Sequence, residues 1–475
     1  MTRLSVEMLA ADTVEPITSA GHAQLGIAVL AGIAVIVLLI TQFKLHAFLS
    51  LTLGSLALGA IAGAPLDKVI TSFSAGLGTT VAGVGVLIAL GAILGKMLAD
   101  SGGADQIVDT ILAKAGGRSM PWAMVLIASV IGLPLFFEVG VVLLIPVVLM
   151  VAKRGNYSLM RIGIPALAGL SVMHGLVPPH PGPLVAIDAV GADLGVTLAL
   201  GVLIAIPTVI IAGPVFSRFA ARWVDVPAPE RMLQALGESG QSPEERAAKK
   251  PQRRPAFGPT LLTILLPVVL MLSKALVDIV IDDPENSVQR VFDVVGSPMI
   301  ALLAAVLLGI FTLLMPAGFG KERVSPLVEK SLAPIAGILL IVGAGGGFKQ
   351  TLIDTGVGQM VLDISKDWSI PALLLAWLIA VAIRLATGSA TVATVSAAGL
   401  VAPLAAEMST THAALLVLAI GAGSLFFSHV NDAGFWLVKE YFGLDVGQTI
   451  KTWSVMETII SVVAGGLVLL LSLVI

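Results

Sequence analysis

Apolar segments long enough to cross a bilayer recur along this chain, separated by short polar connections. A helix needs about 20 residues to cross the hydrocarbon core. The clearest candidates lie near residues 24–42 and 45–63, from Val81 to Ala99, and near 196–217, 259–281 and 297–316. Short amphipathic stretches near 65–76 and 322–332 precede glycine-rich runs in the two halves of the chain. The pattern predicts an all-α polytopic membrane protein.

Two apolar segments with interrupted centres predict re-entrant helical hairpins. In residues 121–152, arms of roughly 13 residues flank GLPLFFEVG, and arms of that length are too short for two crossings. The second hairpin is expected over about 371–407, with its tip from Arg384 to Thr391. Basic residues flank the first hairpin and acidic residues flank the second, which indicates that they open on opposite sides of the membrane.

Two further helices are expected to be discontinuous. The stretch Ser171 to Pro183, SVMHGLVPPHPGP, holds four prolines, which must end a helix that begins near Ser158. The stretch Ser428 to Gly434, SHVNDAG, places polar side chains between apolar runs. Broken backbone at membrane depth is tolerated only where protein or a water-filled cavity satisfies it, and transporters build substrate sites there. We interpret the two breaks as equivalent halves of one site.

The order of segments in the first half of the chain returns in the second. The sequence GAILGKMLADSG matches the last residues of GAGGGFKQTLIDTG, with Gly91 over Gly345 and Asp100 over Asp354. In both halves this match is followed by a hairpin and then by a broken helix. About five crossings plus one hairpin per half would invert the second half relative to the first. The sequence therefore predicts two inverted-topology repeats, each with a re-entrant hairpin and a discontinuous helix.

Polar segments divide the chain into domains. Residues 222–256 are the longest polar segment and are predicted to be a cytoplasmic linker. The linker separates a first transmembrane repeat, 23–221, from a second, 257–475. Residues 1–22 lack the basic region and apolar core of a cleavable signal and are expected to be an extramembrane tail. Asp188 and Asp193 are expected outside the membrane.

Composition supports this class and narrows the chemistry. The chain is 57% hydrophobic and 12% charged over 475 residues, which excludes a soluble globular domain and makes the lipid bilayer a partner. It has no cysteines, so disulfides and thiolate metal sites are excluded. No metal or cofactor is expected. The net charge of −3 argues neither for nor against a charged partner, and no nucleic-acid partner is expected.

The helix breaks carry ionisable side chains, which are costly within a membrane and are therefore functional candidates. His180, bracketed by prolines, is a candidate for substrate binding or proton coupling, and its alternative role is to cap a helix end. His174 lies on the helix before the break, and it is either a functional residue or a side chain that bonds a neighbour. His429, Asn431 and Asp432 fit helix capping or ligand binding, which are compatible because a helix N-terminus suits a carboxylate.

The hairpin tips supply the other candidates. The second tip offers hydroxyls and backbone groups without charge, as a polyhydroxylated ligand requires, from Thr387, Gly388, Ser389 and Thr391. Packing of small residues is the alternative reading of that tip. Arg384 is a candidate counter-charge for a carboxylate, because its planar fork matches that group, or it pairs with an acid elsewhere. Glu138 at the first tip is either a proton carrier or a structural hydrogen-bonding group. The proton-coupling candidates are thus Glu138, His180, His429 and Asp432.

Eight segments of the chain occur together in one order: GAILGKMLADSGG, FFEVGVVLLIPVV, LSVMHGLVPPHPGP, AIPTVIIAGPV, GGGFKQTLIDTGV, RLATGSATVATVSAAG, FSHVNDAGFWLVKEYF and TIKTWSVMETIISVV. In this order and spacing they resemble the gluconate permease family, from about Gly32 to the C-terminus. The resemblance implies a proton-coupled symporter for gluconate or a related sugar acid in a bacterial inner membrane. It also implies kinship with the ion-transporter superfamily, in which a transport domain moves like an elevator.

In that superfamily the site lies at the hairpin tips and the nearby helix breaks. The resemblance therefore implies a site at Pro134 to Glu138, His180 to Gly182, Thr387 to Thr391 and His429 to Asp432. It adds Pro134, Phe136 and Gly182 to the substrate-binding candidates. Elevator-type relatives are usually dimers, so a homodimer is an expectation from the resemblance alone.

Alternative functions remain open at this point. Members of the family carry several sugar acids and D-serine, and the tips do not discriminate among small carboxylates. Sodium can replace the proton as coupling ion, because unwound carbonyls at the breaks would bind it. An intramembrane hydrolase using Ser389 is the rival from another class, but no catalytic triad or HExxH arrangement supports it, so an enzyme is not expected. Inverted halves with occluding hairpins argue against a channel.

Overall fold

The computed structural model describes residues 16–135, 137–227, 229, 253–281, 285–360, 371–429 and 432–475. Helices account for all the regular structure of these residues, as the apolar pattern predicts. In chain order the elements are α1 (His22–Thr41), α2 (Ala47–Ile61), α3 (Leu66–Asp100), α4 (Gly103–Leu112), η3 (Gly117–Ser119), α5 (Met120–Gly132), α6 (Phe137–Gly155), α7 (Leu159–Leu176), α8 (Pro181–Val190), α9 (Leu194–Ile210), η4 (Ile211–Val215), α10 (Ser217–Trp223), α13 (Phe257–Val280), α14 (Ser287–Val295), α15 (Pro298–Gly309), η5 (Ile310–Leu314), α16 (Lys321–Leu332), η6 (Ala333–Ile335), α17 (Ala336–Asp354), α19 (Ala372–Thr387), α20 (Ala390–Ala405), α21 (Thr410–Ser424), α22 (Ala433–Phe442), α23 (Val446–Thr449), η7 (Ile450–Ser454) and α24 (Val455–Leu471).

Seven helical segments of the described chain are long and apolar enough to cross a membrane. An eighth is formed if the pair Ser287–Val295 and Pro298–Leu314, bent by 63°, counts as one broken span. The shorter apolar helices of 10–17 residues include both arms of the second hairpin. The prediction of a multi-pass, all-α membrane protein is therefore confirmed.

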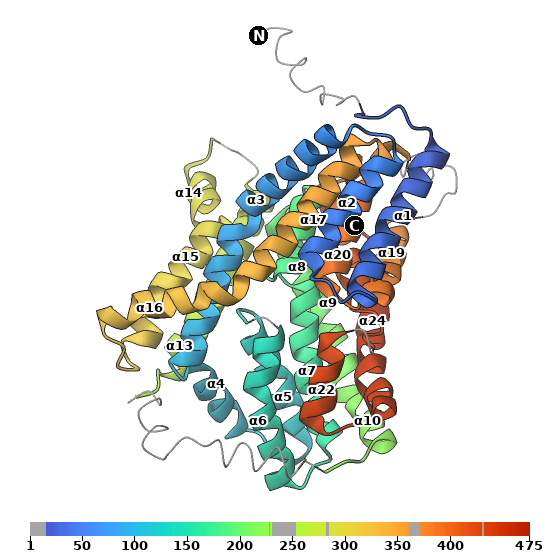
Figure 1. Ribbon diagram of the computed structural model, residues 1–475. Helices are drawn as coiled ribbons and strands as arrows, with labels where there is room; N and C mark the ends of the chain where they lie inside the picture. The colour runs from blue at the N-terminus through green and yellow to red at the C-terminus, as the bar shows by residue number, and fades with distance from the viewer. Residues whose placement is uncertain are drawn as a thin grey trace.

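Helices α3 and α17 run side by side (Figure 1) and meet through small residues. A Cβ atom placed on Gly346 of α17 would lie 2.2 Å from Thr80 Oγ1 and 2.5 Å from the carbonyl oxygen of Gly76. Such close approach of two backbones is how helices pack without a hydrophobic driving force between them. The amphipathic stretch near 65–76 and the glycine-rich run that follows form one helix, α3, because no helix-breaking residue separates them.

Helix pairs lie where the two hairpins were expected, with 13 residues in α5, 19 in α6 and 16 in each of α19 and α20, so α6 is longer than the predicted arm of roughly 13 residues. Helices α5 and α6 form the first, joined by residues 133–136, of which Phe136 lies outside the described residues. Helices α19 and α20 form the second, joined by Gly388 and Ser389. Gly388 has φ +72°, a left-handed conformation that glycine adopts without strain, and so ends α19 abruptly.

Both predicted helix breaks are also present. Helix α7 ends at Leu176 and α8 begins at Pro181, while α21 ends at Ser424 and α22 begins at Ala433. Each hairpin packs on broken helices: α5 and α6 contact α7, α19 contacts α21, and α20 contacts both α8 and α21. The hairpin tips and the breaks are thereby brought into one region of the fold (Figure 1).

The matched segments of the two halves make the same local contact. Lys96 Nζ lies 2.8 Å from Asp100 Oδ1, and Gln350 Nε2 donates to Asp354 Oδ1 over 2.8 Å. In the alignment that sets Gly91 over Gly345, these are equivalent positions one helical turn apart.

The described residues include both ends of the expected linker and the whole of α8. Helix α10 continues to Trp223 and α13 begins at Phe257, so the ends of the expected linker are described while 228 and 230–252 are not. Of the two acids expected outside, Asp188 lies in α8 and is half-buried, while Asp193 caps the start of α9. Helix α8 ends at Val190, where Gly191 adopts the left-handed C-cap conformation with φ +68°.

Candidate functional site

A buried ion pair lies at the centre of the region where the breaks and tips meet. Nη2 of Arg384, in the last turn of α19, contacts Oδ2 of Asp432, which precedes α22. Asp432 Oδ1 accepts the backbone N–H of Gly434 over 2.8 Å and so caps α22. Of the roles weighed from the sequence, the structure shows helix capping for Asp432 and pairing with an acid of the chain for Arg384.

A chain of hydrogen bonds supports this aspartate from the C-terminal helix. Trp453 Nε1 donates to Ser428 Oγ over 2.7 Å, and Ser428 Oγ in turn donates to Asp432 Oδ2. The hydroxyl of Ser454 donates to the carbonyl oxygen of Ser428. Trp453 and Ser454 belong to the π-helical segment η7, whose wider turn places both side chains toward the break.

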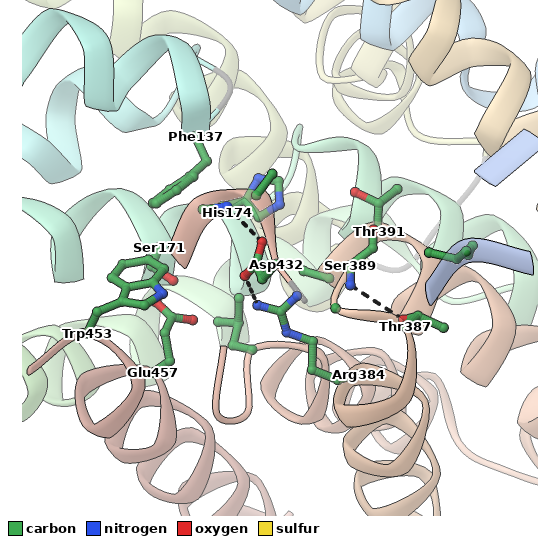
Figure 2. A pocket seen from close by; sticks show the side chains of 16 residues that line it. Phe137, Ser171, His174, Arg384, Thr387, Ser389, Thr391, Asp432, Trp453 and Glu457 are labelled. Carbon is green, nitrogen blue, oxygen red and sulfur yellow. Dashed lines mark hydrogen bonds and ion pairs between the residues drawn. The ribbon is translucent and has the colours of Figure 1, made fainter. Parts of the chain in front are cut away.

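A cavity of about 260 Å³ opens beside the ion pair. Figure 2 shows side chains from three parts of the chain around it: the first hairpin with α7, the second hairpin tip, and the second break with α24. Its polar and aromatic lining comprises Phe137, Ser171, His174, Arg384, Thr387, Ser389, Thr391, Asp432, Trp453 and Glu457. Both halves of the chain thus contribute to one cavity.

The second hairpin tip presents backbone and hydroxyl groups to this cavity. Thr387 Oγ1 donates to the carbonyl oxygen of Ile383 over 2.8 Å, and Ser389 Oγ accepts the N–H of Val392 over 3.3 Å. Gly388 and Thr391 line the cavity beside them. The Ser389 hydroxyl acts as an acceptor in its helix cap, which leaves its proton able to bond a ligand oxygen.

His180 lies one layer behind the cavity wall. It is 4% exposed, and its Nε2 lies 2.7 Å from the carbonyl oxygen of Gly132, the last residue of α5. Its ring contacts that of His174 edge-on, with centroids 5.4 Å apart. His174, which the sequence left between two roles, reaches the cavity itself. His180 therefore satisfies a helix-end carbonyl and supports His174 from behind.

The other described candidates, Pro134, Gly182 and His429, are not among the residues that line the cavity. Pro134 is buried, with its carbonyl oxygen 2.8 Å from where a Cβ on Gly95 would be. Gly182 lies next to Thr394 of α20. His429 Nε2 lies 3.1 Å from the carbonyl oxygen of Leu385. Phe136 and Asn431 lie outside the described residues, as does the side chain of Glu138, whose backbone is in α6.

Sequence reasoning did not identify Trp453, Glu457 or Ser171 as site residues, whereas Phe137 lies within the implied range Pro134 to Glu138. Glu457 carried a usable signal, because it is an acid inside the apolar stretch TIKTWSVMETIISVV. It is 1% exposed, and the hydroxyl of Ser171 bonds its carboxylate. Among the described side chains, the charged groups that line the cavity are a cation, Arg384, and two acids, Asp432 and Glu457. No group of three His, Asp or Glu side chains within the described ranges is arranged to hold a metal.

Comparison with known protein families and curated proteins gives consistent matches. The model of the GntP family permease matches residues 25–474. A gluconate permease of Pseudomonas aeruginosa is 48% identical, with 92% of this chain and 95% of the relative covered. A high-affinity gluconate transporter of Escherichia coli is 43% identical over 91% and 95%, and a gluconate permease of Bacillus subtilis is 41% identical over 94% and 99%.

Two solved transporter structures resemble the fold. The YdaH transporter of Alcanivorax borkumensis matches with a TM-score of 0.57, covering 89% of this chain and 96% of the other. The MtrF protein of Neisseria gonorrhoeae matches with a TM-score of 0.61, covering 85% and 83%. Both are 16% identical in sequence, so they support the helical architecture alone.

Proposed function

The chain belongs to the GntP permease family, and on this premise we propose that it is a proton-coupled symporter that imports gluconate or a related sugar acid. Its relatives are permeases and transporters, so the chain is a transport protein and not an enzyme. The proposed location is a bacterial inner membrane, in which the apolar helices face the lipid bilayer.

The main support for the proposal is the buried guanidinium of Arg384, because two of its nitrogens have no hydrogen-bond partner among the described residues. Arg384 is 3% exposed, and its Nε and Nη1 have no hydrogen-bond partner in the part of the chain that the structure describes. A buried donor without a partner costs roughly 1–3 kcal/mol, more when it is charged. Arg384 lines the cavity, so a carboxylate bound there would satisfy these donors.

The groups around Arg384 suit the rest of a sugar acid. The hydroxyls of Ser389 and Thr391 and the backbone at Gly388 can bond substrate hydroxyls, and Thr387 positions this tip. The first turn of α22 lines the cavity at Ala433 and Gly434, and the N–H of Gly434 is already held by Asp432, so Arg384 is the main electropositive group for the carboxylate. We propose that four residues behind the lining shape the site: Pro134, His180, Gly182 and His429. Phe136 and Asn431 also belong to the proposed substrate-binding residues.

We further propose that the chain works as two inverted repeats, 23–221 and 257–475, joined by a cytoplasmic linker at 222–256 and preceded by an extramembrane tail at 1–22. The repeated order of hairpin and broken helix supports this division, as do the equivalent pairs at Lys96–Asp100 and Gln350–Asp354. Alternating access would then follow from an elevator movement of the hairpins and broken helices, and the functional unit would be a homodimer.

Uptake of labelled gluconate into proteoliposomes tests the function. An imposed gradient, acid outside, should drive accumulation that a protonophore abolishes. Accumulation driven only by an inward sodium gradient would overturn proton coupling in favour of sodium. Absence of gluconate uptake under either gradient, with uptake of D-serine or of another sugar acid instead, would overturn the substrate assignment and keep the transporter.

A further inference from the structure

Glu457 is the second acid of the cavity, and binding of the substrate gives it no role. It lies in α24, within an apolar turn, and its side chain is 1% exposed. Figure 2 shows it with Ser171 and Trp453 at the cavity. A buried acid in a membrane helix is costly, so its presence at a substrate cavity calls for a function.

The two acids of the cavity differ in how their charge is balanced. Asp432 accepts from three donors: the guanidinium of Arg384, the hydroxyl of Ser428 and the N–H of Gly434. Glu457 accepts from the hydroxyl of Ser171, while its Oε1 has no hydrogen-bond partner among the residues described. Asp432 therefore has a counter-charge of its own, whereas Glu457 shares the field of an arginine that is already paired.

We propose that Glu457 is the group that binds the co-transported proton. This inference rests on the proposed proton symport and names its carrier. The titratable and charged groups that face Glu457 are Arg384 from α19, Asp432 before α22 and His174 from α7. An anionic substrate beside Arg384 would add a second uncompensated negative charge to the cavity, unless Glu457 takes up a proton.

Coupling follows from this balance of charge. If the bound anion favours protonated Glu457, then by reciprocity the bound proton favours the anion. The proton comes from water on the side where the cavity is open, sits on a carboxylate oxygen of Glu457, and returns to water on the other side after the anion leaves. No ion pair is broken in either direction, because Arg384 and Asp432 stay paired throughout.

Three of the four earlier candidates fit this role less well, and the side chain of the fourth, Glu138, lies outside the described residues. Protonation of Asp432 would leave Arg384 buried without its counter-charge, which is strongly destabilising. His180 lies behind His174, with Nε2 at 2.7 Å from the carbonyl oxygen of Gly132. His429 is outside the cavity lining and bonds the backbone of Leu385. Glu457 combines access to the cavity with a carboxylate oxygen that has no partner in the described chain.

Substrate-induced proton uptake by purified protein gives the direct test. Gluconate is added to protein in weakly buffered detergent solution with a pH-indicator dye. Wild-type protein and Glu329→Gln, which removes an exposed acid on α16, should take up protons on binding. Glu457→Gln should bind gluconate with an affinity independent of pH and take up none. Uptake by Glu457→Gln equal to that of wild-type protein would overturn the assignment.

Transport measurements distinguish a wrong assignment of Glu457 from a wrong assignment of proton symport. In Glu457→Gln, gradient-driven accumulation of gluconate should fall at least about tenfold, because the coupling to the proton gradient is lost. Exchange of labelled for unlabelled gluconate should change less than about threefold, because substrate binding is kept. Wild-type protein that takes up no proton would overturn proton symport itself. Equal losses of accumulation and exchange would assign Glu457 to substrate binding and overturn the proton role.

A chemical probe covers the case in which Glu457→Gln does not fold. A carbodiimide reacts with protonated carboxyl groups in apolar surroundings, so brief treatment of wild-type protein should modify Glu457 and abolish proton uptake in proportion. Mass spectrometry of the α24 peptide locates the adduct. Loss of proton uptake with the adduct on another acid, and with Glu457 unmodified, would overturn the proposal.

Discussion

The guanidinium of Arg384 and the carboxylate of Asp432 form an ion pair that joins the second hairpin to the second helix break. Their side chains are 3% and 15% exposed, so little water screens the two charges. Because the same carboxylate accepts the N–H of Gly434, it also fixes the start of α22. The position of the hairpin tip relative to the break therefore depends on this pair.

Asp432→Asn removes the charge of that pair while keeping the helix cap, since asparagine caps helices as well as aspartate does. Arg384 is then left buried without a counter-charge, which costs about 3–5 kcal/mol. We expect a loss of that order in the free energy of unfolding, measured by denaturation of the purified protein. Uptake of gluconate should fall to background.

A matched control is Glu440→Gln, which removes an acid paired with Lys439 at 2.7 Å but 70% exposed. Exposed pairs contribute about 0–1 kcal/mol, so this variant should unfold and transport almost as the wild-type protein does. If Asp432→Asn proves as stable and active as Glu440→Gln, the buried pair does not organise the site.

The turn of the second hairpin offers a separate test at Gly388. This residue has φ +72° and lines the cavity. Gly388→Ala should cost about 1–2 kcal/mol because L-residues are strained in the left-handed region. It should also raise the KM for gluconate by displacing the hydroxyls at the tip, and initial-rate uptake measures this.

Gly78→Ala provides the comparison, because Gly78 lies in α3 and a Cβ there would meet nothing within 4 Å. Alanine stabilises an exposed helix position by a few tenths to about 1 kcal/mol relative to glycine, so this variant should be at least as stable as wild type. A KM unchanged in both variants would mean that the tip does not contact the substrate.

The helix breaks and hairpins could be predicted because their signals are local. Pro178 and Pro179 follow the end of α7, and Pro181 and Pro183 lie in the first turn of α8, where proline is tolerated. Hairpin arms of 13 and 16 residues, as in α5, α19 and α20, are short for a bilayer. The cap residue Asp432 and Gly388 at the turn are local signals as well. These features depend on neighbours within a few positions, which the sequence displays directly.

Partners distant in sequence could not be found this way. The sequence left open whether Arg384 pairs with a substrate carboxylate or with an acid elsewhere in the chain. The packing of α19 on α21 brings Asp432 to it. In the sequence, Trp453 is one of several apolar residues in its segment. Only the fold shows that the π-helical turn of η7 directs its Nε1 to Ser428. Asp188 sits near the polar end of α8 in the sequence, yet folding places it against α3 and α17.

The contact between α3 and α17 predicts a strong effect of a small substitution. In Gly346→Ala the new Cβ would lie 2.2 Å from Thr80 Oγ1 and 2.5 Å from the carbonyl oxygen of Gly76. The two helices must then separate, and overpacking of this kind costs about 1–3 kcal/mol. Gly466→Ala in α24, where a Cβ meets nothing within 4 Å, should leave the unfolding free energy unchanged or raised. Equal stabilities of the two variants would contradict this packing.

Asp188 and Lys349 form a second electrostatic contact, outside the cavity. Asp188 of α8 bonds the hydroxyl of Thr80 in α3, and its charge is opposed by that of Lys349 in α17. The carboxylate also lies close to the α3 backbone, since a Cβ on Gly83 would be 2.7 Å from Asp188 Oδ1. This acid therefore ties the second arm of the first broken helix to the α3–α17 pair.

A double-mutant cycle measures the strength of that tie. Asp188→Asn and Lys349→Met should each destabilise the protein, because each leaves the other charge half-buried without its partner. The double variant should lose about 0.5–3 kcal/mol less unfolding free energy than the sum of the two single losses, as expected for residues that interact directly. Asp188→Asn combined with Lys96→Met serves as control, since Lys96 pairs with Asp100 instead, and this combination should be additive. Additivity of the Asp188 and Lys349 changes would mean that α8 is held against α3 and α17 by packing alone.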